Sequence, residues 1–196
     1  MRDMLAAAYV TLAPVILAGI LNMAWVKGRA LSRLSIPMDG GRKMADGHRV
    51  LGDNKTWKGF VGMIVLTALA GVLWGAALEG RPLEAMNLYY RVRPNTTGWS
   101  ALSGAMSGFG YIAFELPNSF LKRRLDIRPG KNPDGLWKPL FIFLDQADSV
   151  IGCLIVLRLF HPFSLAFFLT AVAAGAGTHL VLNMLLYFLK LRRNIF

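Results

Sequence analysis

The chain has 196 residues, of which 55% are hydrophobic and 17% are charged, and its mean hydropathy is +0.45. A soluble domain of this length would have shorter apolar runs and more charge, so the composition excludes an ordinary soluble enzyme and indicates a polytopic helical membrane protein. The 22 Lys and Arg residues outnumber the 11 Asp and Glu residues, and we assign this excess to loops that face anionic headgroups and an anionic substrate, with no nucleic-acid partner.

Five apolar stretches are each about as long as the 20 residues that a helix needs to cross a bilayer. They cover residues 4–26, 59–78, 96–121, 139–157 and 162–189. Small residues in the second and third stretches, among them Gly104 and Gly108, would let neighbouring helices approach closely. We interpret the first stretch as a retained helix, because no small-residue cleavage site follows it. The sequence therefore predicts an all-α integral membrane protein, one bundle of five transmembrane helices in a single domain over residues 1–196.

The loop charges are unequal on the two sides of this bundle. Residues 27–58 carry eight Lys and Arg, residues 122–138 carry six and the C-terminus three, whereas the opposite side carries five in total. Positively charged loops stay in the cytoplasm. We therefore expect a multi-pass protein of the cell membrane, with the N-terminus outside and both long loops and the C-terminus in the cytoplasm.

The region between the third and fourth stretches combines three consecutive cations with two carboxylates. They are Lys122, Arg123, Arg124, Asp145 and Asp148. Two carboxylates three residues apart share a helix face, and there they can hold a magnesium ion, which takes hard oxygens together with substrate phosphates. A pair of carboxylates favoured by the helix-start dipole is the weaker alternative at this depth. For the cations, phosphate binding and simple anchoring at the membrane surface are equally good interpretations.

Polar residues within the apolar stretches fall at one level. At about 1.5 Å of rise per residue, they lie roughly 8 to 14 Å inside the cytoplasmic ends of four helices, with one histidine a turn deeper. They are Asn22, Glu115, Asp145, Asp148, His179 and Asn183. Such groups are costly in lipid and normally face a cavity or each other, so we predict a water-filled site open to the cytoplasm. Asn22 and Glu115 could equally join helices, whereas we favour a ligand-facing role for the stripe of His179 and Asn183.

The sequence LGDNKTWKG places Lys55, Thr56 and Lys58 directly before the second stretch. Backbone N–H groups at a helix start suit phosphate, but the glycine spacing of a P-loop is absent. A solvated basic loop, with Asp53 as a turn residue, is an equally good interpretation. Upstream, the sequence PMDGG around Asp39 is interpreted first as a turn.

Three blocks together resemble the CDP-archaeol synthase family, a compact relative of the CDP-diacylglycerol synthases. The blocks are PMDGGRKMADGHRVLGDNKTWKG, SFLKRRLDIRPG followed by DQADSVIG, and HLVLN in the last stretch. The resemblance covers nearly the whole chain, and the GD-x-KTW-x-G block with S-F-x-KRR and DQ-x-D is fairly specific. It implies a five-helix, magnesium-dependent cytidylyltransferase, which joins CTP to a phosphorylated dialkyl or diacyl glycerol and releases pyrophosphate.

The resemblance also implies roles for individual residues. It places the metal motif on Asp145 and Asp148, the basic motif on residues 122–124 and the loop motif on residues 55–58. We therefore expect catalytic roles for Asp145, Asp148, Lys122, Arg123 and Arg124. We expect substrate contacts from Lys55, Thr56, Lys58, Asp53, Ser119, Asn22, His179 and Asn183.

The chain departs from the family pattern at two positions. Glu115 stands where the family has an Asp, and Asn118 stands where a Lys commonly precedes Ser119. Because a Glu can still reach a metal through its longer arm, we count Glu115 with Asp145 and Asp148 as a metal ligand.

A transporter and a CDP-alcohol phosphotransferase are the alternatives to this enzyme. A small lipid or anion transporter would spread its polar groups across the bilayer, whereas here they lie at one level. A CDP-alcohol phosphotransferase would carry a longer aspartate pattern than this sequence has. Besides CTP, the lipid phosphate and the bilayer, a second copy of the chain is a possible partner.

Overall fold

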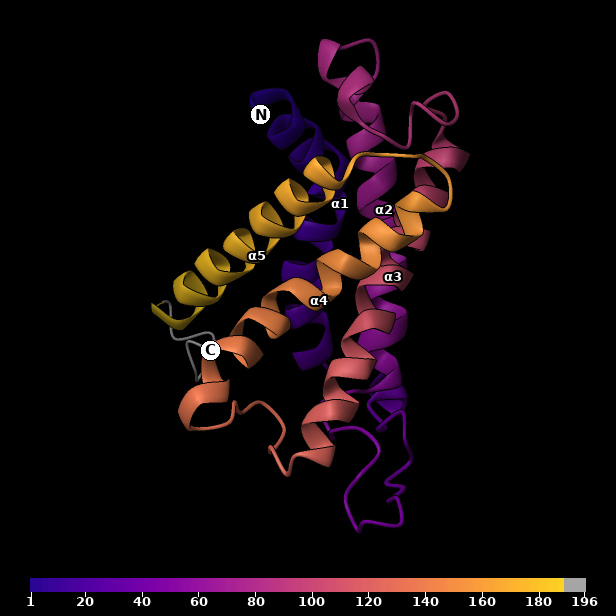
Figure 1. Cartoon of the computed structure of the whole chain (residues 1–196). Helices are drawn as coiled ribbons and strands as arrows, with labels where there is room; N and C mark the ends of the chain where they lie inside the picture. The colour runs from indigo at the N-terminus through magenta and orange to yellow at the C-terminus, as the bar shows by residue number, and fades with distance from the viewer. Residues whose placement is uncertain (189–196) are drawn as a thin grey trace.

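Within residues 1–188, which the computed structural model describes, the chain forms five long helices (Figure 1). These are α1 (Arg2–Lys27), α2 (Trp57–Leu78), α3 (Thr97–Arg124), α4 (Lys138–Arg158) and α5 (Leu165–Phe188). Single 3-10 turns, η1 (Ser32–Leu34), η2 (Pro82–Met86) and η3 (Gly135–Trp137), lie in the connections. The all-α prediction is confirmed. The C-terminal cations and residue 189 of the last predicted helix lie outside the described residues.

Helix boundaries differ from the predicted stretches at two places that bear on function. Helix α3 continues to Arg124, so the three cations form its last turn instead of opening a loop. Helix α5 begins at Leu165, after Ser164 Oγ accepts a hydrogen bond from the Phe167 N–H at 3.2 Å. Thr56 and Thr96 cap α2 and α3 in the same way, accepting from the N–H groups three residues on.

Helix α3 is the central element of the bundle. It packs along α2 on one side and α4 on the other, while α1 packs on α2, and α5 joins α4 to α1. In Figure 1, α4 and α5 cross the molecule obliquely to α1, α2 and α3. The connections 28–56 and 125–137 lie at one end of the molecule, and the N-terminus lies toward the other.

Small residues allow these close packings. A Cβ added at Gly110 of α3 would lie 2.6 Å from the carbonyl oxygen of Gly152 in α4. One added at Gly104 would collide with the Thr67 carbonyl of α2, and one at Gly108 would lie 2.8 Å from the Met63 carbonyl. Helix α3 therefore presents glycine to both neighbours, as the small-residue pattern predicts for helices that pack without a hydrophobic driving force.

Four of the helices, α1, α2, α4 with its preceding turn and α5, are long and apolar enough to cross a membrane. Helix α3 has 28 residues, but its mixture of serines, glycines and charged residues gives it a lower hydropathy than the other four. Ser100, Ser103 and Ser107 of this helix are buried. The protein has the make-up of a membrane protein, whereas the fifth crossing and the orientation stay predictions.

Candidate active site

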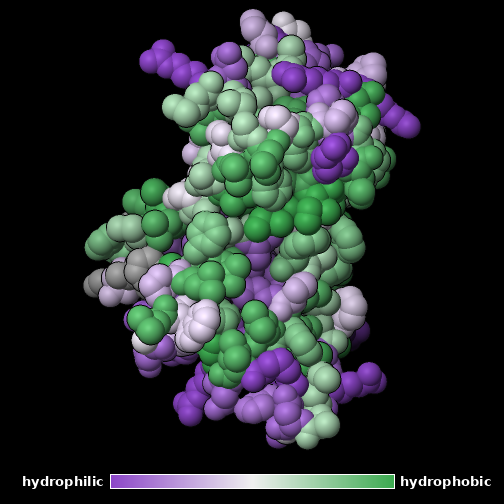
Figure 2. Space-filling view, in the orientation of Figure 1, coloured by the Kyte–Doolittle hydropathy of each residue, from purple (hydrophilic) through white to green (hydrophobic). Residues whose placement is uncertain are grey.

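Two adjoining cavities open between the helices at the end that carries both long connections. The smaller, of about 200 Å³, is lined mainly by polar and charged side chains of α3, α4 and α5. The larger, of about 460 Å³, is lined by both polar and apolar side chains of α1, α2, α3 and α5, together with Asp145 of α4. Five residues line both cavities: Asn54, Lys55, Glu115, Asp145 and Asn183. Figure 2 shows hydrophilic atoms in a recess between apolar surfaces midway along the molecule.

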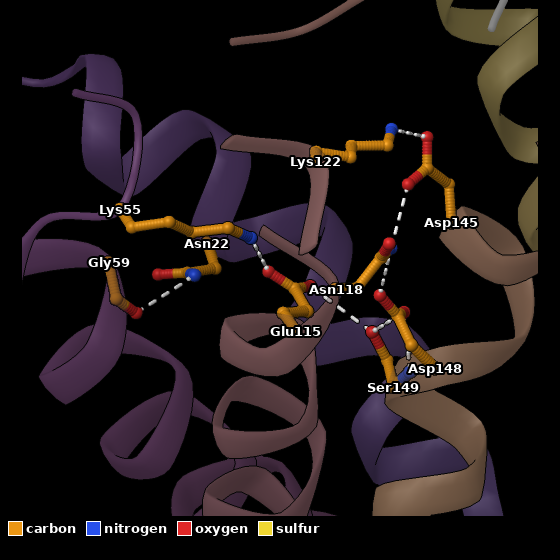
Figure 3. Close-up of polar contacts among 9 residues, drawn as sticks. All are labelled: Asn22, Lys55, Gly59, Glu115, Asn118, Lys122, Asp145, Asp148 and Ser149. Atoms are coloured by element: carbon orange, nitrogen blue, oxygen red, sulfur yellow. Dashed lines mark hydrogen bonds and ion pairs between the residues drawn. The ribbon is translucent and has the colours of Figure 1, made fainter. Parts of the chain in front are cut away.

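A carboxylate pair on α4 lines the smaller cavity, and Figure 3 shows its polar contacts. The Asn118 amide nitrogen donates a hydrogen bond to Asp145 Oδ1 and another to Asp148 Oδ2, each at 2.8 Å. Lys122 Nζ lies 2.5 Å from Asp145 Oδ2 and donates to Asn132 Oδ1 at 3.0 Å. The last turns of α3 therefore supply an amide that donates hydrogen bonds to both carboxylates and an ammonium that neutralises part of their charge.

Glu115 lies one turn before Asn118 on α3 and is occupied by other partners. Its Oε2 forms an ion pair with Lys55, and its Oε1 accepts from the Ser149 hydroxyl at 3.2 Å. The same hydroxyl lies 3.1 Å from Asp148 Oδ1. Glu115 thus connects the segment before α2 to α4, and Figure 3 shows Lys55 reaching it from the side of α2.

The oxygen donors of this site fit a divalent cation. Asp145 and Asp148 supply hard carboxylate oxygens from one helix face, the donor type that magnesium takes together with phosphates and water. Within residues 1–188, no group of three His, Cys, Asp or Glu side chains lies close enough to hold a metal ion. The third predicted ligand, Glu115, forms an ion pair with Lys55, and its role toward a metal stays a prediction.

The three consecutive cations point to three different places. Lys122 reaches Asp145, and Arg123 lines the smaller cavity. Arg124 leaves the site: its Nη1 contacts Asp46 Oδ1 and Oδ2 at 2.8 and 2.7 Å, and its Nη2 donates to a carbonyl of the 28–56 connection. Of the predicted catalytic cations, the structure therefore brings Lys122 and Arg123 to the cavity and uses Arg124 as a tether.

Arg123 is the cation of this trio without a carboxylate contact in the described chain. Its residue is 6% exposed, and its Nε and Nη1 atoms have no hydrogen-bond partner among the described residues. A buried guanidinium with two unpartnered nitrogens is costly. Because the fork geometry of Arg matches phosphate oxygens, the group is suited to an anion that enters the cavity.

The residues before α2 also separate in role. Lys55 lines both cavities, and Thr56 caps α2 beside the larger one. Lys58 is fully buried, donates to the Gly28 carbonyl at 2.6 Å and lies 5.3 Å from the centre of the Trp25 ring. It holds the end of α1 against α2 and does not line either cavity.

The other predicted substrate contacts are distributed over the two cavities. Asn22 and His179 line the larger one, where Asn22 donates to the Gly59 carbonyl at 3.1 Å and His179 lies beside the Tyr111 ring. Ser119 lines the smaller cavity, and Asn183 lines both and donates to Gln146 Oε1 at 2.9 Å. Asp53 is exposed, pairs with Arg49 and lies outside both cavities.

Sequence reasoning missed the residue that organises the 28–56 connection. Asp39 is buried and accepts hydrogen bonds from the Gly41 and Leu51 N–H groups and from Arg49 Nε and Nη2. Burial raises the pKa of Asp39, but these hydrogen bonds outweigh burial and hold the pKa at about 2. Its neighbour Met38 donates to the Lys55 carbonyl at 2.8 Å, so Asp39 helps to place Lys55. The role of Asp39 could not be predicted, because an Asp ten residues before an Arg in a loop follows no helix or strand periodicity.

The long apolar helices and the polar cavities between them are features expected of an intramembrane enzyme. A solved structure of an intramembrane enzyme for archaeal membrane lipid biosynthesis is similar over 90% of this chain and 92% of its own, with a TM-score of 0.63 and 26% identity. The family model for CDP-archaeol synthase matches residues 5–196. The CDP-archaeol synthase of Thermofilum pendens is 35% identical over 94% of this chain and 74% of its own length. That of Methanococcoides burtonii is 30% identical over 80% of this chain and 88% of its own.

The chain belongs to the CDP-archaeol synthase family. It is accordingly a nucleotidyltransferase that uses CTP and a lipid phosphate, as the sequence blocks predicted. The transporter and the phosphotransferase are set aside by this membership.

Proposed function

We propose that the protein transfers CMP from CTP to an archaeol-type lipid phosphate, with Mg²⁺ held by Asp145 and Asp148. The observation that carries the proposal is the junction of the two cavities at Lys55, Glu115 and Asp145. One cavity is lined by cations and carboxylates, and the other is lined by polar and apolar side chains together. A nucleoside triphosphate needs a charged cavity, and the phosphate end of a lipid needs an adjoining cavity that is partly polar and partly apolar.

The smaller cavity is assigned to the CTP phosphates. Arg123 offers unpaired guanidinium nitrogens there, and Lys55 offers an ammonium at the junction. The larger cavity is assigned to the lipid headgroup, with Asn22, Thr56 and His179 at its polar side and Met23, Phe60 and Met63 at its apolar side. Its volume of about 460 Å³ falls in the range of about 300 to 1,000 Å³ that is usual for ligand sites.

The reaction needs positioning and charge neutralisation more than acid–base catalysis. An oxygen of the lipid phosphate forms a bond to the α-phosphorus of CTP, the bond from that phosphorus to the bridging oxygen breaks, and pyrophosphate leaves with the electron pair. The attacking oxygen is already an anion, so no general base has to remove a proton. Magnesium, when bound, neutralises phosphate charge in the transition state. Lys122 holds the Asp145 carboxylate in orientation for that role.

Purified protein with CTP labelled at the α-phosphate, Mg²⁺ and a panel of ether- and ester-linked lipid phosphates tests the proposal. We expect a labelled CDP-lipid and one pyrophosphate for each product, with the ether lipid preferred. Asp148→Asn should lose about two or more orders of magnitude in rate while its melting temperature in detergent stays close to that of the wild type. Release of labelled CMP without any CDP-lipid, for every lipid of the panel, would contradict the transfer reaction.

A further inference from the structure

Asn118 has an unusual environment for an amide. Its nitrogen lies 2.8 Å from one oxygen of Asp145 and 2.8 Å from one oxygen of Asp148, and so bridges the two carboxylates symmetrically. Its oxygen is buried and has no hydrogen-bond partner among the described residues. A buried amide oxygen without a donor costs about 1 to 3 kcal/mol. Half of this side chain is therefore satisfied by the carboxylates, and the other half is not satisfied.

Which end of the amide faces the carboxylates depends on what lies between them. Two carboxylates on their own are acceptors, so they select the NH₂ group. A cation between them selects oxygen. A half-turn of the amide about its terminal bond exchanges nitrogen and oxygen without moving α3 or α4. The side chain can thus serve as a hydrogen-bond bridge without a cation and as an oxygen ligand with one.

The neighbouring candidate for a third ligand is already engaged. Glu115, one turn earlier on α3, pairs with Lys55 and accepts from the Ser149 hydroxyl. Lys122, one turn later, pairs with Asp145 Oδ2, the oxygen that Asn118 does not contact. Asn118 is the α3 side chain between them, and it touches both carboxylates (Figure 3).

We propose that Asn118 is a metal ligand of this protein, its amide oxygen completing a three-oxygen site with Asp145 and Asp148 for a divalent cation. The inference rests on the proposed function, which assigns the cation to these two carboxylates. Two carboxylates and an amide carbonyl, with water and phosphate oxygens, form a donor set that suits Mg²⁺ or Mn²⁺.

Mn²⁺ binding to the purified full chain in detergent, without CTP or lipid, tests the inference. Electron paramagnetic resonance of free Mn²⁺ gives the dissociation constant directly. We expect Asn118→Ala to weaken Mn²⁺ binding by about tenfold or more and Asn118→Asp to strengthen it by a similar factor. If Asn118 only donates hydrogen bonds to the carboxylates, Asn118→Ala removes a competitor of the metal, and affinity stays the same or rises. That result would overturn the inference.

A change of metal preference provides a second test, which does not depend on overall affinity. A thiolate ligand favours soft cations, so Asn118→Cys should shift the preference for Cd²⁺ over Mn²⁺ by about tenfold or more. Ser119→Cys, which adds a thiol at the next residue of the same cavity, is the matched control and should shift it far less. Equal shifts in the two variants would contradict ligation by residue 118. The native Cys153 is buried and contributes equally to every measurement.

The controls separate this inference from the proposed function. If the wild type binds no Mn²⁺, or Asp148→Asn binds it as tightly as the wild type, the carboxylate site itself is wrong and both proposals fail. If Asp148→Asn loses Mn²⁺ while Asn118→Ala retains it, only the role of Asn118 fails. Asn183→Ala, which removes another amide of the same cavity, should leave Mn²⁺ affinity nearly unchanged. Melting temperatures without metal show that each variant is folded.

Discussion

At the scale of single residues, the last turn of α3 shows how neighbouring side chains of one charge acquire different roles. Consecutive residues on a helix point about 100° apart, so three adjacent cations cannot all face one ligand. Lys122 pairs with Asp145, Arg123 lines the smaller cavity, and Arg124 is held by Asp46. The composition of the KRR motif left phosphate binding and anchoring at the membrane surface as equally good interpretations. The three cations contact different partners because they leave the helix in different directions and meet different neighbouring elements.

Arg123 should combine a cost in stability with a benefit in activity. Because its guanidinium is buried with two unpartnered nitrogens, Arg123→Leu should raise the free energy of unfolding by about 1 to 3 kcal/mol. The same change should lower kcat/KM for CTP by about tenfold to a hundredfold, the value of one charge-assisted hydrogen bond. Steady-state kinetics and thermal unfolding in detergent measure the two effects. A variant that is less stable and fully active would show that Arg123 is a structural cation.

Asp39 should make the stability of the 28–56 connection, which lies outside the long apolar helices, depend on pH. Its folded-state pKa of about 2 is below the ordinary value of 3.8, so its ionised form stabilises the 28–56 connection at every pH above about 4. This stabilisation is lost as the pH falls toward 2. We expect pepsin to cleave the connection progressively faster between pH 4 and pH 2 in the wild type. Asp39→Asn should be cleaved rapidly throughout, and the ratio of the two rates at each pH cancels the pH response of pepsin. A constant ratio would contradict the role of Asp39.

At the scale of elements, α3 brings the site together because it packs closely on both sides. Glycines face α2 and α4, and the polar residues of its second half then meet side chains from both directions. The long apolar runs predicted where the helices lie, since each run needs only its own residues to be recognised. The connections were harder: Asp39 acts through Arg49, ten residues away, and Lys58 acts through the end of α1. These contacts depend on how the loops fold back on the helices, and a local sequence pattern does not predict that.

The contact between α3 and α4 should be sensitive to a single methyl group. Gly110→Ala would place a Cβ 2.6 Å from the Gly152 carbonyl, and relief of that overlap should cost about 1 to 3 kcal/mol of unfolding free energy. It should also separate Asp148 from Asn118 and Glu115, and so lower activity. Gly177→Ala is the matched control, because a Cβ at that helical position has no heavy atom within 4 Å. It should be neutral or stabilise the protein by up to about 1 kcal/mol. Unfolding in mixed detergent micelles compares the two, and equal stabilities would argue against close packing of α3 on α4.

At the scale of the whole molecule, the positions of the loops connect charge to function. The two connections rich in Lys and Arg lie at the same end as the cavities, and the N-terminus lies toward the other end (Figure 1). An orientation that keeps positive loops in the cytoplasm would therefore also open the smaller cavity to the compartment that contains CTP. The same excess of positive charge would attract both the nucleotide and anionic headgroups toward the entrance.

Labelling in intact cells with a membrane-impermeant maleimide should reveal this orientation. The single native cysteine, Cys153, is buried in α4 and gives little background. Arg81→Cys places a thiol in the exposed connection between α2 and α3, and Lys43→Cys places one in the exposed part of the 28–56 connection. We expect the thiol at 81 to react in intact cells and the thiol at 43 to react only after the membrane is opened. The reverse pattern would mean that the protein has the opposite orientation and that the cavities open to the cell exterior, away from cytoplasmic CTP. Reaction of both thiols in intact cells would mean that α2 does not cross the membrane. Only the expected pattern places the polar cavity, its carboxylates and Arg123 in reach of a cytoplasmic nucleotide and a lipid of the same bilayer.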